Sequence, residues 1–377
     1  MEARRVVNRR EAAGDSLLAH DADRAPESGQ IVISVYENEV PPFVETALEL
    51  LYENIFSSLA KVRLDDKQGN TSTYVVCDEG KVLTIFLFRM ENRTVQVLNE
   101  VISIDEVDIG RFANTIFSSY ASAAVISFHA VQTSIRTLPY HFQRFNCLED
   151  IVLTLPATPQ EYFSSLGKSM RASIKRYTKK LGQEFASFFY RVCTSDDVNE
   201  QDVRDIVNLS SARMQVKNKV SLHDEKKTEQ LIQLVRMHGL VAVATIGGRV
   251  CAGVICSRLG ANYFMHVIAH DPEYDEFRLG KLCCYRTICE CIERGGKEFH
   301  FLWGRYEYKY RLLGVQRELD HVAVYRSAAH LLLNGDKVWK NAFRGYGRQL
   351  KRWLLAPARA DTLIGKLAGT LVKGRSG

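Results

Sequence analysis

The sequence predicts two α/β domains in tandem, each with a mixed, mostly antiparallel sheet flanked by helices. Three observations lead to this prediction. The chain has 377 residues, enough for two domains of ordinary size. Both halves show the same order of expected elements: a helix, a meander of three strands, a helix and a further strand. The proline-containing segment Leu155-Pro-Ala-Thr158 separates the halves.

Residues 1–30 are rich in charge and alanine and poor in aromatic side chains, which predicts a disordered segment. The N-terminal domain is then expected over residues 31–154. Apolar periodicity predicts a helix from Val44 to Leu59, after the break at Pro41-Pro42, and another from Val107 to Tyr120. Strands are expected at Ser72–Cys77, Val82–Phe88, Val95–Val101 and Ala124–His129, with turns at 78–80 and 91–93.

The C-terminal domain is expected over residues 155–330 and repeats this order. Gly247-Gly248 suits a tight hairpin, because glycine reaches positive φ freely. The shared order favours duplication of one domain, although no sequence identity between the halves is evident. The expected helices are Asn199–Lys217, Lys226–Met237 and Gly280–Arg294, and the expected strands are Leu240–Ile246, Val250–Arg258, Tyr263–Ala269 and Glu298–Trp303.

Composition and charge indicate a soluble protein with a basic tail. No window holds 18 consecutive apolar residues, and the polar N-terminus lacks a signal peptide, so we expect a cytoplasmic protein. Residues 336–377 contain ten Lys/Arg and two Asp, while the rest of the chain is close to neutral. This tail interleaves Trp339 and Trp353 with basic residues. Such an amphipathic segment can lie on the inner face of an anionic membrane or dock its apolar side on the protein.

The cysteines do not predict a metal site. Nine cysteines without an export signal indicate reduced thiols. Cys283, Cys284, Cys289 and Cys291 fall on one expected helix, but their spacing is not that of a zinc site. Buried thiols are the preferred interpretation, and no metal is expected.

The segment Arg278-Leu-Gly-Lys281 follows a polar loop and opens an apolar-faced helix. The first N–H groups of a helix have no partners within it and lie at the positive end of the helix dipole. Gly280 permits close approach of the backbone, and Arg278 and Lys281 add positive charge. The segment therefore predicts an anion site suited to a pyrophosphate, although an ordinary helix cap would have a similar sequence.

The stretch Glu298-Phe-His-Phe-Leu-Trp-Gly304 is followed by Tyr308-Lys309. It resembles the signature of the CelD-like (BioF-type) branch of the GNAT acyltransferase superfamily. Pro159–Tyr162 and Leu166–Tyr177 are similar to the basic helix that opens the transferase domain in that branch. The resemblance covers residues 155–325. The order of elements also resembles that of the FemABX aminoacyl transferases, which pair two GNAT-like domains.

The resemblance implies acyl transfer from acetyl-CoA or another acyl-CoA to an amine or a hydroxyl. The loop with Arg278, Gly280, Lys281 and Leu282 is similar to the acyl-CoA pyrophosphate loop, with its glycine displaced. The pantetheine would run between the strands expected at 263–269 and 298–303.

Four side chains are candidates for the acid and base of this reaction. A phenol can protonate the leaving thiolate, and Tyr308 and Tyr310 both stand just past Gly304. A neutral imidazole can accept the proton of the nucleophile, and His266 and His300 lie on neighbouring expected strands. Structural roles for all four remain open.

Basic side chains on the expected helix Lys168–Lys180 are candidate substrate contacts. Lys168, Arg171, Lys175 and Lys179 share one face, which can bind phosphate, nucleotide sugar, tRNA or anionic polysaccharide, or simply face solvent. Lys309 is a further candidate contact for a substrate phosphate.

The leading hypothesis is a bacterial acyl-CoA N- or O-acyltransferase that acts on a sugar or polysaccharide precursor in envelope or exopolysaccharide synthesis. One alternative is a FemABX-like transferase that uses aminoacyl-tRNA, against which the 278–281 loop argues. Another is a non-catalytic scaffold with the same fold at a membrane-bound synthase. No DNA partner is expected.

Overall fold

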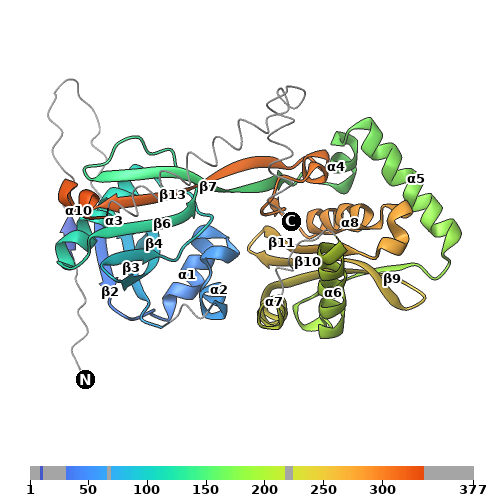
Figure 1. Ribbon diagram of the computed structural model, residues 1–377, viewed down its shortest axis with the longest axis horizontal. Coiled ribbons are helices and arrows are strands. Elements are labelled where there is room, and N and C mark those ends of the chain that lie inside the picture. The colour runs from blue at the N-terminus through green and yellow to red at the C-terminus, as the bar shows by residue number, and fades with distance from the viewer. Residues whose placement is uncertain (1–8, 12–30, 66–68, 217–223, 335–377) are drawn as a thin grey trace. The chain divides into compact units, whose positions relative to one another are not determined.

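The computed structural model describes residues 9–11, 31–65, 69–216 and 224–334, and these form two compact units (Figure 1). One unit holds the described residues up to 145 together with 320–334. The other holds 146–319. The chain thus passes from the first unit to the second within β7 (His141–Thr154) and back within β13 (Val315–Tyr325). The boundary predicted at 154/155 did not include this return, because neither strand was expected from the sequence. The basic tail at 336–377 and the segment 1–8 lie outside the described residues, as do 12–30.

The first unit is built on a sheet with the strand order β1-β2-β3-β4-β5-β6-β13. Its neighbouring strands are antiparallel except for the parallel pair β5–β6. The strands are β1 (Arg9–Glu11), β2 (Ile31–Tyr36), β3 (Ser72–Asp78), β4 (Lys81–Glu91), β5 (Thr94–Val97), β6 (Val125–Val131) and β13. The helical segments are α1 (Phe43–Tyr52), η1 (Ile55–Ser57), α2 (Leu59–Leu64), α3 (Glu106–Ser119) and α10 (Ala328–Leu333).

Helices pack on both faces of this first sheet. Val44 and Leu48 of α1 pack with Ile85 and Leu87 of the sheet. On the opposite face, Phe112 of α3 lies among the aromatic side chains of the strands. Its ring centroid is 4.9–5.9 Å from those of Tyr74, Phe86, Phe88 and Phe128.

The second unit has the strand order β7-β12-β11-β10-β9-β8. All its neighbouring strands are antiparallel except β11 and β12, which are parallel. Besides β7, the strands are β8 (Phe189–Thr194), β9 (Gly239–Ile246), β10 (Arg249–Leu259), β11 (Asn262–His270) and β12 (Glu298–His300). The helical segments are α4 (Pro159–Ser165), α5 (Lys168–Glu184), η2 (Ser195–Asp197), α6 (Glu200–Val216), α7 (Glu225–His238), η3 (Pro272–Phe277), α8 (Leu279–Glu293) and α9 (Glu307–Arg311).

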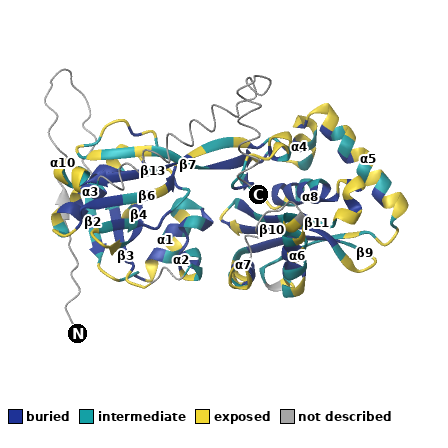
Figure 2. Cartoon of the chain, in the orientation of Figure 1, coloured by how far each residue is buried: buried dark blue, intermediate teal, exposed yellow. Residues whose placement is uncertain are grey.

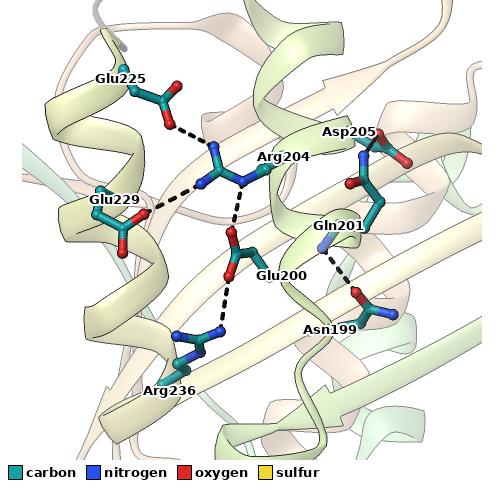
Figure 3. Close-up of polar contacts among 8 residues, drawn as sticks. All are labelled: Asn199, Glu200, Gln201, Arg204, Asp205, Glu225, Glu229 and Arg236. Atoms are coloured by element: carbon teal, nitrogen blue, oxygen red, sulfur yellow. Dashed lines mark hydrogen bonds and ion pairs between the residues drawn. The ribbon is translucent and has the colours of Figure 1, made fainter.

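Helices again cover both faces of the second sheet. Val203 and Ile206 of α6, with Val235 of α7, pack on one face. The helices α4, α5 and α8 pack on the other, and α8 is buried along most of its length (Figure 2). Arg204 joins α6 to α7: it pairs with Glu200 of its own helix and with Glu225 and Glu229 of α7, and Glu200 also binds Arg236 (Figure 3).

The predicted duplication of element order is confirmed. In both units a strand and helices precede a three-strand meander, a helix and a strand. The last meander strand pairs in parallel with the strand after that helix, over three residue pairs in each unit. The predicted hairpin at Gly247-Gly248 is confirmed, with φ of 57° and 81° at the two glycines.

Three predicted boundaries differ from the structure. The helix expected over 44–59 ends at Tyr52, because Glu53 adopts a left-handed conformation, and α2 starts afresh after Ser58. The strands expected to reach Val101 and Trp303 end at Val97 and His300. Positive φ at Val101 and Leu302 takes the chain out of the extended conformation. Among the described helices, none is both long and apolar enough to cross a membrane.

Helix α6 approaches β10 so closely that residue 253 must lack a side chain. A Cβ at Gly253 would lie 2.2 Å from Cδ1 and 2.3 Å from Cγ1 of the buried Ile206. We expect Gly253→Ala to destabilise the protein by about 1–3 kcal/mol in urea unfolding. Adding Ile206→Val should recover part of this loss. In the control, Gly182→Ala on α5 meets no atom within 4 Å and should stabilise by up to about 1 kcal/mol. Equal effects of the two alanines would contradict this packing.

Candidate active site

Strands β11 and β12 of the second unit pair over only three residues. The paired residues are Asn262 with Glu298, Tyr263 with Phe299, and Phe264 with His300. Strand β11 runs on to His270, whereas β12 ends at His300. The backbone then turns away through positive φ at Leu302 (55°) and Gly304 (87°). The two parallel strands therefore diverge, and the edge of β11 beyond Phe264 has no β12 partner.

Lys309 of α9 fixes the course of the chain after β12. Its ammonium donates hydrogen bonds to three successive carbonyl oxygens, those of Phe301 (2.8 Å), Leu302 (3.0 Å) and Trp303 (2.5 Å). An ammonium has three donors, so these bonds use them all. The residue is 2% exposed, and burial lowers the pKa of Lys309 to about 8. The prediction that Lys309 contacts substrate is therefore not met in this structure, where it shapes the backbone.

His300 belongs to a buried chain of charges. Its Nδ1 lies 2.6 Å from Oδ2 of Asp150 on β7, and its Nε2 lies 3.3 Å from Oε2 of Glu298. Arg317 in turn donates to both carboxylate oxygens of Glu298, at 2.9 and 2.5 Å. The imidazole also stacks on Phe264, with ring centroids 4.4 Å apart.

These contacts favour the charged form of His300. Burial is the largest influence and favours neutral imidazole, but the hydrogen bonds of Asp150 and Glu298 together outweigh it and raise the pKa of His300. The hydrogen bond from His300, with the Arg317 contacts, lowers the pKa of Glu298 to about 2. Because both ring nitrogens face carboxylates, the expectation of His300 as a general base does not fit this geometry.

His266 lies in a β-bulge of β11. Ile255 pairs with Val267 and Cys256 with Met265, which leaves His266 as the extra residue. A bulge re-aims the side chain it carries and is common beside active sites. The Nε2 of His266 lies 2.8 Å from the hydroxyl of Ser257. Of the two predicted histidines, His266 remains a candidate for the general base.

Tyr308 and Tyr310 differ in their surroundings. Tyr308 packs edge-on to Phe301, and burial raises its pKa, so it stays protonated at neutral pH. Among the described residues its hydroxyl has no hydrogen-bond partner. The ring of Tyr310 is exposed, and its hydroxyl donates to Gln316 (3.3 Å). The choice of proton donor between these two tyrosines stays a prediction.

The predicted anion site lies at the start of α8. Arg278 is its N-cap residue in a left-handed conformation. Gly280 is required there, because a Cβ would meet Nδ1 of His270 at 2.6 Å. Leu282, expected to contact cofactor, instead has its side chain buried in the core, and its N–H donates to the Arg278 carbonyl.

Cations from two elements lie near this helix start: Arg278 and Lys281 at α8, and Arg311 on α9, which also pairs with Glu307. Burial, and then the positive charges of Arg311 on α9 and Arg278, lower the pKa of Lys281. A hydrogen bond from Arg278 is the largest influence that lowers the pKa of Tyr177 on α5. Like charges held this close favour a bound anion.

The equivalent helix of the first unit lacks this character. Helix α3 begins with Asp105 as N-cap, whose carboxylate accepts a hydrogen bond from the N–H of Asp108. Glu106 and Asp108 add negative charge in the first turn. Since its own carboxylates fill this helix start, the duplicated position in the first unit repels a phosphate.

Arg171 and Lys175, the predicted substrate contacts on α5, lie on the solvent side of that helix. Arg171 donates to the carbonyl of Ser164 at 2.5 Å, and the ammonium of Lys175 lies 5.4 Å from the ring centroid of Phe163. Among the described residues, neither Arg171 nor Lys175 has a hydrogen bond or an ion pair with the residues at the end of β12.

Sequence reasoning missed the partners of His300 and Lys309. Asp150 is 150 residues from His300, so no local pattern connects them. Glu298 stands two residues before His300 on one strand, and this spacing could have indicated a pair on one face.

The described part of the chain contains no group of three or more His, Cys, Asp or Glu that could hold a metal. Cys283, Cys284 and Cys291 are buried in the core, as their position on the expected helix indicated.

Part of the second unit is similar to a known protein family. Residues 168–310 match a family model described as an acetyltransferase (GNAT) domain. No curated protein sequence matches the chain. Among solved structures, FemX superposes with a TM-score of 0.59 at 7% identity, over 78% of this chain and 98% of FemX.

Two further solved structures are also similar. L-PGS from Bacillus licheniformis has a TM-score of 0.50 at 13% identity, over 79% of this chain and 96% of that one. The C-terminal domain of a putative synthetase from Agrobacterium fabrum has a TM-score of 0.48 at 12% identity, over 78% and 94%. At these identities the likeness concerns the fold.

The charge of His300 makes stability depend on pH. A raised pKa means that the folded state holds the proton more tightly, so this contribution is complete below the ordinary pKa of 6.5 and is lost as the pH rises through the folded value. We expect the stability difference between wild type and His300→Gln to shrink above pH 6.5, by up to about 1.4 kcal/mol per pH unit, in urea unfolding from pH 5.5 to 8. The control His141→Gln is exposed and should give a flat difference. A flat profile for His300→Gln would argue against the charged network.

Removing the ammonium of Lys309 should release the end of β12. We expect Lys309→Met to destabilise the protein by at least about 2 kcal/mol, because three buried carbonyls lose their donor. Amide hydrogen exchange at 301–304 should accelerate. The exposed Lys227→Met serves as control and should change neither quantity. Unaltered exchange at 301–304 would show that another contact holds this segment.

Proposed function

We propose that this chain, whose residues 168–310 form a GNAT-type domain within a FemABX-related fold, transfers an acyl group from acyl-CoA to an amine or a hydroxyl. The observation that carries the proposal is the divergence of β11 and β12 beside the cationic start of α8. An extended thioester arm can lie along the free edge of β11. The helix N-terminus, Arg278 and Lys281 can bind its diphosphate.

The assignment of the donor to the second unit follows from charge. The helix start of α8 gathers cations, whereas that of α3 is capped by Asp105 and followed by two further acidic residues. A diphosphate is therefore attracted to the second unit and repelled by the equivalent position in the first.

Direct transfer requires few groups from the protein. The nucleophile attacks the thioester carbonyl carbon, the new C–N or C–O bond forms, and the C–S bond breaks. His266 would accept the proton of the nucleophile, and Tyr308 would donate its proton to the thiolate. Burial keeps Tyr308 protonated until the thiolate forms, while the raised pKa also makes the phenol a weaker acid, so the donation depends on how close the thiolate lies.

The acceptor that we propose is a sugar or polysaccharide precursor, used in envelope or exopolysaccharide synthesis in the bacterial cytoplasm. This part of the proposal rests on the resemblance of 298–309 to the CelD-like branch. The tail at 336–377 would hold the enzyme at the inner face of an anionic membrane, which its basic, Trp-bearing sequence suits.

The FemX-like alternative has its own support. The match covers a larger share of FemX than of the other two structures compared above, and the TM-score for FemX is higher. An aminoacyl ester on tRNA would then replace the thioester, with its terminal phosphates at α8. The scaffold alternative keeps the fold without turnover, attached through 336–377.

Calorimetry with acetyl-CoA separates these alternatives. We expect binding to the wild type and at least a tenfold weaker Kd for Arg278→Ala combined with Lys281→Ala. The control Lys226→Ala combined with Lys227→Ala removes the same charge from α7 and should bind normally. No binding of acetyl-CoA or CoA by the wild type would contradict the proposed donor. A steep, salt-sensitive affinity for aminoacyl-tRNA would then favour the alternative.

Replacing Tyr308 tests the proton donor. We expect Tyr308→Phe to lower kcat by about 10²–10⁴ with little change in the KM for donor, because only leaving-group protonation is lost. Release of CoA thiol with a panel of amino-sugar acceptors measures this effect. Tyr310→Phe is the matched control and should stay near wild type. Full activity of Tyr308→Phe, or equal losses in both variants, would contradict the assignment.

A further inference from the structure

Helix α5 presents an exposed row of cations that the proposed reaction does not use. Four of them recur every three or four residues on one side of the helix, and a fifth broadens the row. At 1.5 Å per residue, the row from 168 to 179 is about 16 Å long. We call it the α5 cationic face; it comprises Lys168, Arg171, Lys175, Arg176 and Lys179.

The charge of this face is not neutralised within the protein. In the described part of the chain, none of its five members is ion-paired with a carboxylate. Lys180, at its edge, shows the contrast: it pairs with Glu276 at 2.5 Å and with Glu184 at 3.7 Å. Five unpaired cations on one helix form a surface for an extended polyanion.

The helix is fixed in place, and its outer side carries charge without exposed large apolar residues. Met170, Ile174 and Leu181 are buried in the core of the second unit. None of the exposed large apolar side chains lies on α5, and Figure 2 shows exposed residues along its outer side. A helix that lies in a membrane needs apolar side chains to insert. This one has already used them, which favours a ligand held by charge.

Aromatic rings lie beneath two of the cations. The ammonium of Lys175 is 5.4 Å from the ring centroid of Phe163, and the guanidinium of Arg176 is 4.6 Å from that of Tyr177. Planar guanidinium and aromatic groups beside a cationic row suit a ligand with both phosphates and flat bases.

The face also continues into the anion site at α8. Arg176 donates to the Tyr177 hydroxyl at 2.8 Å, and Arg278 at the start of α8 lies near enough to lower the pKa of the same phenol. An anionic ligand at α8 can therefore extend along α5. CoA carries only one phosphate besides its diphosphate. A row of five cations about 16 Å long can contact more phosphates than that.

We propose that the α5 cationic face binds the phosphate backbone of single-stranded RNA. Successive phosphates would contact the five cations, and bases would stack on exposed guanidinium or aromatic planes. The proposal does not rest on acyl-CoA being the donor, since the face lies outside the residues assigned to that site.

The test is the salt dependence of RNA binding by the full chain. Fluorescence anisotropy with a labelled, mixed-sequence 12-nucleotide single-stranded RNA is measured from 25 to 300 mM KCl. The variant is Lys168→Gln, Lys175→Gln and Lys179→Gln together. For single strands each phosphate contact adds about 0.7 to the slope of log K against log salt, so this variant should flatten the slope by about 2.

The control removes three exposed lysines elsewhere, with Lys81→Gln, Lys226→Gln and Lys227→Gln together. It should keep the wild-type slope, and the basic residues of 336–377 contribute equally to both variants. Equal urea midpoints in all three proteins exclude misfolding as the cause.

Two results would overturn the proposal: no RNA binding at 25 mM KCl, or equal slopes in the two variants. Vesicles with anionic lipid form a parallel arm. If the α5 variant loses vesicle binding while neither the wild type nor this variant binds RNA, the face is a membrane contact instead. Acetyl-CoA titration in the same variants should be unchanged. Failure of RNA binding with normal acetyl-CoA binding would sink this inference alone.

Discussion

The structure of the candidate site depends on one buried ammonium. Two parallel strands in register would ordinarily continue to pair, since each added pair satisfies further backbone groups. Lys309 removes this option for β12 by taking the carbonyls of residues 301–303 as its own acceptors. Its burial lowers the affinity of Lys309 for its proton, yet three hydrogen bonds compensate, and the divergence of β11 and β12 follows.

The second constraint is the charge chain that anchors the other end of β12. Asp150, His300, Glu298 and Arg317 alternate in sign, so each charge has an opposite neighbour, and Asp150 and His300 are buried. The two devices act on a strand of three residues: the network fixes where β12 lies beside β7, and Lys309 fixes where it stops. The proposed acid and base, Tyr308 and His266, belong to neither set of contacts.

The two units share one order of elements, and they differ in charge at one helix start. Both units repeat the meander, the helix and the three-pair parallel contact. The helix starts then diverge: Asp105 caps α3 with its own carboxylate, while Arg278 and Lys281 leave α8 ready for an external anion. The proposed donor site in the second unit rests on the charge of these few residues.

The sequence predicted most local elements, because their signals are local. The meanders of both halves, the Gly247-Gly248 turn and the helix from Lys168 follow from periodicity and turn chemistry. The strands β7 and β13 escaped prediction because their partners lie far along the chain. The role of Lys309 escaped for a related reason: its spacing from Tyr308 suggested a substrate contact, and only the fold shows three carbonyls converging on its ammonium. Likewise, no sequence pattern near His300 predicts its contact with Asp150.

Hydrogen exchange of the full chain with and without CoA tests the central claim most directly, that the diverging strands and the start of α8 form the donor site. The account predicts slower exchange of amides at 265–270 and 279–283 when CoA is present, with no change at 106–110 of α3. Protection at the start of α3, or protection nowhere in 262–283, would contradict it.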